Sequence, residues 1–168
     1  MSDAVDAIIG QWTAERPDLA EAIWPVEVLA RVQRMAMVLS KEVKTFSVEH
    51  GLEMGEFDVL TTLRRSGPPY ALTAGAFLKA AMVTSGAITN RIDKMETKGL
   101  VERVRDGSDR RTVKIRLTDK GLALTDQLMD DHLANYARIA KALTPEDCAQ
   151  VADGLRKLLE AHGDTSIT

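Results

Sequence analysis

The chain has 168 residues, of which 45% are hydrophobic and 28% charged, with a formal net charge of −3 and a single cysteine. This length suits one domain with a buried core. No run of 18 apolar residues is present, which excludes a transmembrane helix, and the single Cys148 excludes an internal disulfide. The N-terminal residues lack the basic segment of a secretory signal, so we expect a cytoplasmic protein.

Three helices are predicted in the first 66 residues from the spacing of apolar side chains, over residues 4–16, 25–50 and 55–66. Proline or glycine follows each helix, at Pro17, Gly51 and Gly67. In the third helix, we expect the side chains of one stripe to face the core: Phe57, Leu60 and Leu63.

Two further helices are predicted close together. Thr73–Ala81 forms a short helix capped by Thr73, and Ser85–Lys98 forms a second helix ended by Gly99. Only Met82–Thr84 connects them. The second helix begins with small and polar residues, while Ile88, Ile92 and Met95 form its apolar stripe.

A β-hairpin follows these helices. Val113, Ile115 and Leu117 alternate with Lys114 and Arg116, which is typical of a half-buried strand. The preceding strand contains Val101 and Val104, and Asp106-Gly-Ser supplies the turn. The hairpin therefore presents Arg110 and Arg111 near its tip.

Two long helices complete the chain. Thr118 is expected to cap a helix that runs to about Lys141, and Thr144 to cap the last helix with Pro145 at its first position. The predicted fold class is mainly α with a small β-hairpin wing, that is, a winged helix-turn-helix flanked by N- and C-terminal helices. In such a fold the second helix enters the DNA major groove.

The candidate DNA contacts lie on this helix, on the turn before it and on the wing. Asn90 suits an adenine edge, and the arginines suit a groove or the phosphates. Residues 91–116 contain nine basic and five acidic residues, a net +4, whereas residues 1–30 contain one basic and six acidic residues. The complete set of expected contacts is Thr84, Ser85, Gly86, Thr89, Asn90, Lys94, Arg110 and Arg111.

The run from Ser85 to Arg103, then Asp106-x-x-Asp-Arg-Arg111 and Leu117-Thr-x-x-Gly121, resembles the recognition helix and wing of the MarR (multiple antibiotic resistance regulator) family. The resemblance implies a homodimeric repressor built from terminal helices 1–50 and 119–168 around a winged domain, 51–118. Two-fold symmetry implies a pseudo-palindromic operator with half-sites about 34–36 Å apart. A monomer with mutually packed terminal helices is the alternative.

An N-terminal helix with a tryptophan resembles the urate-responsive PecS/HucR-like subgroup of that family. This resemblance implies a ligand site at Trp12, Asp58, Arg65 and Arg91. Urate is a flat anion, so an arginine can pair with its charged edge and a tryptophan can stack on it. The expected effector is therefore a small anionic aromatic molecule, urate or another purine, and no cofactor or metal is expected. Ordinary packing and solvated positions are the alternative.

Two other functions remain open. Cys148 lies in the first turn of the last helix, where a thiol-based redox repressor could use it, although a passive core residue is favoured. A winged-helix protein-interaction module without DNA binding is the other alternative. His50, His132 and His162 lack metal-ligand spacing and are expected at the surface. No catalytic motif is present, so an enzyme is not expected.

Overall fold

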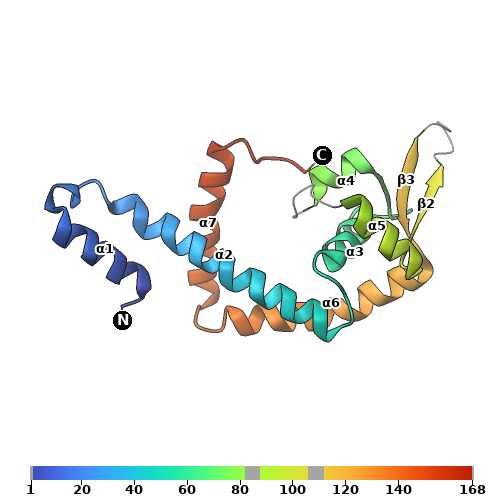
Figure 1. Cartoon of the computed structure of the whole chain (residues 1–168), viewed down its shortest axis with the longest axis horizontal. Helices are drawn as coiled ribbons and strands as arrows, with labels where there is room; N and C mark the ends of the chain where they lie inside the picture. The colour runs from blue at the N-terminus through green and yellow to red at the C-terminus, as the bar shows by residue number, and fades with distance from the viewer. Residues whose placement is uncertain (1, 82–87, 106–111, 168) are drawn as a thin grey trace. The chain divides into compact units, whose positions relative to one another are not determined.

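The computed structural model describes residues 2–81, 88–105 and 112–167. The chain divides into two units, Met1–Gly51 and Leu52–Thr168, each with its own internal contacts (Figure 1). No helix within the described ranges is long and apolar enough to cross a membrane.

The first unit contains α1 (Ala4–Glu15), a short 3-10 helix η1 (Pro17–Leu19) and α2 (Trp24–Glu49). The two helices predicted over residues 4–16 and 25–50 are confirmed. Asp3 begins α1 with a capping box, in which its carboxylate accepts from the Val5 and Asp6 amides while the Asp6 side chain accepts from the Asp3 amide.

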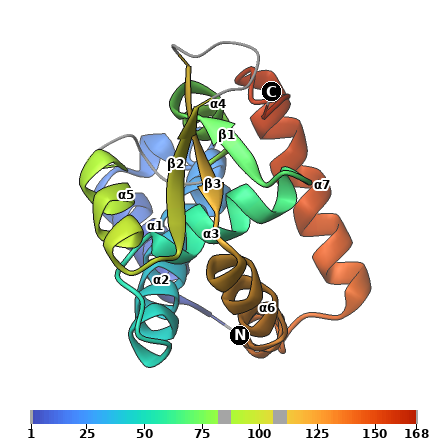
Figure 2. The ribbon, with the colours of Figure 1, turned by 90° about the vertical axis from the view of Figure 1, so that its right-hand side faces the viewer.

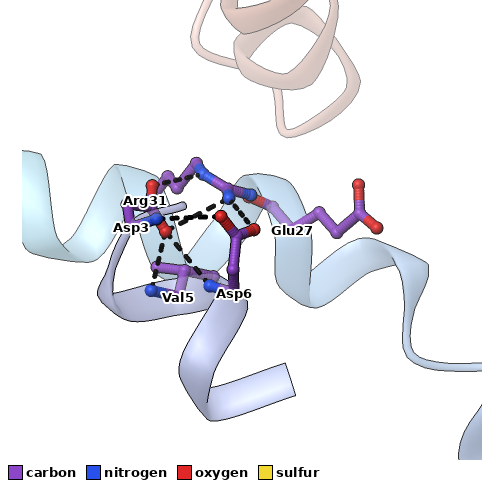
Figure 3. A network of polar contacts seen from close by, with 5 residues as sticks. All are labelled: Asp3, Val5, Asp6, Glu27 and Arg31. Carbon is purple, nitrogen blue, oxygen red and sulfur yellow. Dashed lines mark hydrogen bonds and ion pairs between the residues drawn. The ribbon is translucent and has the colours of Figure 1, made fainter. Parts of the chain in front are cut away.

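The guanidinium of Arg31 in α2 forms ion pairs with the start of α1. Arg31 of α2 donates to Asp3 at 2.8 Å and to Asp6 at 2.5 Å, and also to the Glu27 carbonyl one turn earlier (Figure 3). The two capping carboxylates of α1 are thus also the acceptors of the interhelical ion pairs, so one cluster both begins the helix and holds it against α2.

A three-stranded antiparallel sheet lies in the second unit, in the order β1-β3-β2 (Figure 2). The two strands of the predicted hairpin are confirmed as β2 (Val101–Arg105) and β3 (Val113–Leu117), while the turn predicted at Asp106-Gly-Ser lies outside the described residues. The sequence analysis missed β1 (Ala71–Thr73), which pairs with the other edge of β3 through Leu72 and Ile115.

The described part of this unit also contains five helices: α3 (Glu56–Arg65), α4 (Ala74–Ala80), α5 (Ile88–Thr97), α6 (Asp119–Ile139) and α7 (Pro145–Ala161). Phe57, Leu60 and Leu63 of α3 are buried as predicted, together with Phe77 of α4. Thr73, Thr118 and Thr144 cap α4, α6 and α7 as expected, each by accepting a backbone N–H from the first turn.

The beginning of α6 lies directly against the end of the α5–β2 connection. The Thr118 amide donates to the Leu100 carbonyl at 3.2 Å, and the Thr118 hydroxyl donates to the neighbouring Gly99 carbonyl at 2.7 Å. A Cβ added to Gly121 would lie 2.0 Å from the Leu100 carbonyl oxygen. The glycine is required here because only a residue without a side chain lets the helix approach the backbone so closely.

Two expectations about single side chains are wrong. Cys148 is exposed rather than in the core, and all of its neighbours from residue 141 to residue 150 are exposed as well. Among the histidines expected at the surface, only His162 is exposed, while His50 and His132 are half-buried. The His132 ring lies between Phe57 and Tyr136, at centroid distances of 4.9 and 4.2 Å, because α6 packs against α3.

Candidate nucleic-acid interface and effector residues

The solvent face of α5 carries those expected DNA-contact residues that the structure describes. Thr89, Asn90 and Lys94 are exposed, while Ile92 and Met95 of the same helix are buried in the core. The helix is thus fixed by its apolar side and leaves its polar side accessible. Five other expected DNA contacts lie outside the described residues: Thr84, Ser85, Gly86, Arg110 and Arg111.

Two ion pairs connect the basic residues of α5 and its C-terminal end to the start of α3. The Lys94 ammonium donates to Glu53 at 2.7 Å, and Lys98, four residues later, donates to both Glu56 oxygens at 2.7 and 2.8 Å. Glu56 is fully buried and also accepts the Glu53 amide. The hydrogen bond between Lys94 and Glu53 lowers the pKa of this carboxyl and raises the pKa of the ammonium, so both groups stay charged.

The acidic residues of α5 are paired as well. Arg103 of β2 donates to Asp93 at 2.5 Å and to Glu96 of the same helix, and its backbone N–H donates to Glu96 at 3.1 Å. The hydrogen bond to Asp93 is the main cause of the raised pKa of Arg103. Arg103 therefore neutralises two carboxylates on the recognition helix and ties this helix to the wing strand beside it (Figure 2).

The ion pairs of Lys94 and Lys98 mean that the net +4 of residues 91–116 overstates the local positive charge. The net charge of residues 91–116 includes Lys94 and Lys98, but their partners Glu53 and Glu56 lie outside that segment. Sequence reasoning missed both carboxylates as neighbours of the recognition helix, because no motif links residue 53 to residue 94. The most that the sequence offers is Glu56 at the start of the third predicted helix and Glu53 two residues before that helix.

Arg91 faces the N-terminal end of α3. A Cβ on Gly55 would lie 2.7 Å from the Arg91 guanidinium carbon, so the guanidinium packs on the glycine that precedes α3. Gly55 has a φ of +82°, a left-handed conformation that favours glycine on its own account. The Arg91 Nη1 atom is buried and has no hydrogen-bond partner among the described residues.

The two other effector candidates of this unit lie on α3. Asp58 is in its first turn, half-buried, with its Oδ2 atom buried. Arg65 is in its last turn, exposed, and donates to the Ala80 carbonyl at the end of α4. Trp12 belongs to the other unit, where it lies on α1 with 53% of its surface exposed. No cluster of metal-ligating side chains is found in the part of the chain that the structure describes.

Comparison with known proteins gives the family of this fold. The model of the MarR family matches residues 52–113. The transcriptional regulator PecS of Dickeya dadantii is 34% identical over 143 residues, which are 85% of each chain. The chain belongs to the MarR family. It is a winged-helix transcription regulator of that family, and its likeness to PecS extends over both units.

Solved structures of MarR proteins have the same fold. A mutant MarR of Escherichia coli complexed with operator DNA is 26% identical, with a TM-score of 0.64, and the match covers 79% of this chain and 96% of that one. BpsR of Bordetella bronchiseptica, whose DNA binding is regulated by 6-hydroxynicotinic acid, is 22% identical, with a TM-score of 0.68 over 78% and 91% of the two chains.

Proposed function

We propose that this MarR protein is a homodimeric repressor that binds a pseudo-palindromic operator and changes its DNA affinity when it binds a small anionic aromatic ligand. One observation carries the DNA-binding part: the first turn of α5 presents Thr89 and Asn90 to solvent while the apolar side of the helix is buried. A helix held in this way can enter a major groove without losing core contacts.

The terminal helices are proposed to form the dimer. In α2, one apolar stripe is 37–51% exposed: Leu29, Val32, Met35 and Leu39. In α7, the residues Val151, Leu158 and Leu159 are 39–52% exposed. Contiguous apolar faces of this kind mark protein interfaces. The proposed division assigns 51–118 to DNA and 1–50 with 119–168 to dimerisation. Truncation after Thr144 should yield monomer or aggregate in sedimentation, and a monomeric intact chain would contradict the dimer.

The effector is proposed to be urate or another purine anion. Arg91 supports an anion, because its buried Nη1 has no hydrogen-bond acceptor among the described residues and lies beside the N-terminal end of α3, which also favours negative charge. Arg65 is proposed to pair with the anionic edge of the ligand and Asp58 to accept from its ring N–H groups. Trp12 is proposed to contribute to the same response through its exposed ring.

Direct titration tests the DNA-binding part. A duplex selected from a random pool should bind the protein with an affinity that decreases steeply as salt increases. Asn90→Ala should reduce the preference over scrambled DNA by about 1–3 kcal/mol, and Arg110→Ala should weaken binding to both duplexes. A protein with no salt-dependent DNA binding would instead favour a protein-interaction module.

A second titration tests the effector. Urate or xanthine added to the protein–DNA complex should change the DNA affinity by about 5–150-fold. Arg65→Ala should abolish this response and leave DNA affinity largely intact. Arg64→Ala is the matched control, because the neighbouring arginine of α3 pairs with Asp126. An unchanged complex, or an Arg65→Ala variant that responds like the unaltered protein, would remove these residues from the effector site.

A thiol response remains the second candidate, since Cys148 is exposed. Release of DNA by a mild thiol oxidant, lost in Cys148→Ser, would support a redox repressor. Retention of DNA by the oxidised protein, together with release by urate, would support the anionic effector.

A further inference from the structure

The two ion pairs between α5 and α3 differ in their exposure to solvent. Lys98 pairs with Glu56, whose side chain is 1% exposed, whereas the side chains of Lys94 and Glu53 are 58% and 53% exposed. Breaking a pair that contains a buried charge is costly, while an exposed pair contributes little to stability. Lys94 can therefore leave Glu53 for another anion at little cost in stability, whereas separating Lys98 from Glu56 is costly.

Lys94 lies on the part of α5 where phosphate contacts are expected. It follows Asn90 by four residues, so the two side chains leave the same side of the helix, and both are exposed. A helix whose first turn meets the bases has the DNA backbone beside its next turn. In the DNA-free protein, the Lys94 ammonium already donates to the Glu53 carboxylate at 2.7 Å.

We propose that Glu53 competes with DNA phosphate for the Lys94 ammonium and thereby limits the affinity of this protein for DNA. The inference rests on the proposed DNA-binding function. Glu53 acts through Lys94 and needs no contact with DNA of its own. On binding, Lys94 exchanges a carboxylate for a phosphate, and Glu53 is left solvated close to a polyanion.

The exchange of the Glu53 carboxylate for a phosphate also changes the number of salt ions released when the protein binds DNA. Neutralising one phosphate with a free cation contributes a slope of about −0.9 to the dependence of log affinity on log salt. When the cation comes from an internal pair, the abandoned carboxylate attracts a salt cation, and the net release is smaller. Removing the carboxylate should therefore make DNA binding both tighter and more dependent on salt.

Glu53→Gln tests the proposal. The amide keeps the size of the side chain and leaves untouched the Glu53 backbone N–H that donates to Glu56. Fluorescence anisotropy with a selected operator and a scrambled duplex should show about two- to fivefold tighter binding, the range expected for one exposed pair. The salt slope should steepen by up to about 0.9. Both duplexes should change equally, since a phosphate contact carries no sequence information.

Two controls separate this effect from a general loss of negative charge. Asp126→Asn removes a carboxylate of nearly equal exposure, 52%, that pairs with Arg64 at the same 2.7 Å distance, and should leave DNA affinity unchanged. In a Lys94→Gln background, the additional Glu53→Gln change should tighten binding much less, because the competing cation is absent and only the repulsion between the carboxylate and the phosphates is removed.

Three results would overturn the proposal: unchanged or weaker DNA binding by Glu53→Gln with a normal melting temperature, equal tightening by Asp126→Asn, or tightening that persists at full size in the Lys94→Gln background. The failure of the proposed function is a different result, because the unaltered protein would then not bind DNA at low salt. A protein that binds DNA but ignores Glu53→Gln retains the proposed function and loses only this inference.

Discussion

Gly121→Ala should destabilise the protein even though alanine is the better helix former. The new Cβ would lie 2.0 Å from the Leu100 carbonyl oxygen and 3.3 Å from Leu117 Cδ2. A normal carbon–oxygen contact is about 3.3 Å, so α6 and the Leu100 backbone must separate by about 1.3 Å. That carbonyl accepts a hydrogen bond from the Thr118 amide at 3.2 Å. The separation therefore weakens this hydrogen bond as well.

The expected free-energy loss follows from three contributions. Forcing a methyl group into a filled site costs about 1–3 kcal/mol, and weakening one hydrogen bond costs about 1 kcal/mol. The higher helix propensity of alanine relative to glycine offsets about 1 kcal/mol of this loss. The net loss is about 2 kcal/mol, which lowers the melting temperature of a chain of this size by about 4–8 °C.

Differential scanning calorimetry at one fixed protein concentration measures this change. Gly154→Ala is the matched control, because Gly154 is also within a helix, α7, and has no atom within 4 Å of an added Cβ. It should gain about 0.5–1 kcal/mol. If Gly121→Ala is as stable as the unaltered protein, the close approach of α6 to Leu100 is not a packing constraint.

Three other perturbations have defined outcomes. Lys98→Met should lower the free energy of unfolding by about 3 kcal/mol in denaturant melts, because it leaves the buried Glu56 carboxylate without the ammonium that pairs with it. A loss below about 1 kcal/mol would mean that Glu56 is solvated. Burial lowers the pKa of His132, so stability should be full above about pH 6.5, where the unfolded histidine is neutral, and decrease as pH falls toward the folded value. His132→Phe should remove that part of the pH dependence, and an unchanged profile would assign it elsewhere. Arg31→Gln should accelerate amide hydrogen exchange over α1, whereas uniform protection would show that the Asp3 and Asp6 pairs do not hold this helix.

The sequence predicts the helices of this protein well because their boundaries are local. Thr118 and Thr144 cap α6 and α7 through hydrogen bonds three residues away, and Gly99 ends α5 with a φ of +69°. Strand β1 was missed because three residues are too few for a periodic pattern, and because it exists only through pairing with β3, more than forty residues later.

Side-chain environments set by distant contacts could not be predicted. His132 looks like a surface residue in sequence, and its half-buried position between two aromatic rings arises from the packing of α6 on α3. The net +4 counted for residues 91–116 overestimates the local positive charge for the same reason, because only the tertiary structure brings Glu53 to Lys94. The proposed effector residues stay a prediction from type and spacing.

The pairing of Arg103 with Asp93 and Glu96 has a consequence for any attempt to change the DNA sequence preference proposed for this protein. Reprogramming a regulator by exchanging only its recognition helix assumes that the helix is independent of its surroundings. Here a donor helix without acidic residues at these two positions would leave the Arg103 guanidinium with neither carboxylate acceptor and would lose the bonds that set the helix against β2. The smallest portable unit is therefore α5 together with β2, and a graft should move both.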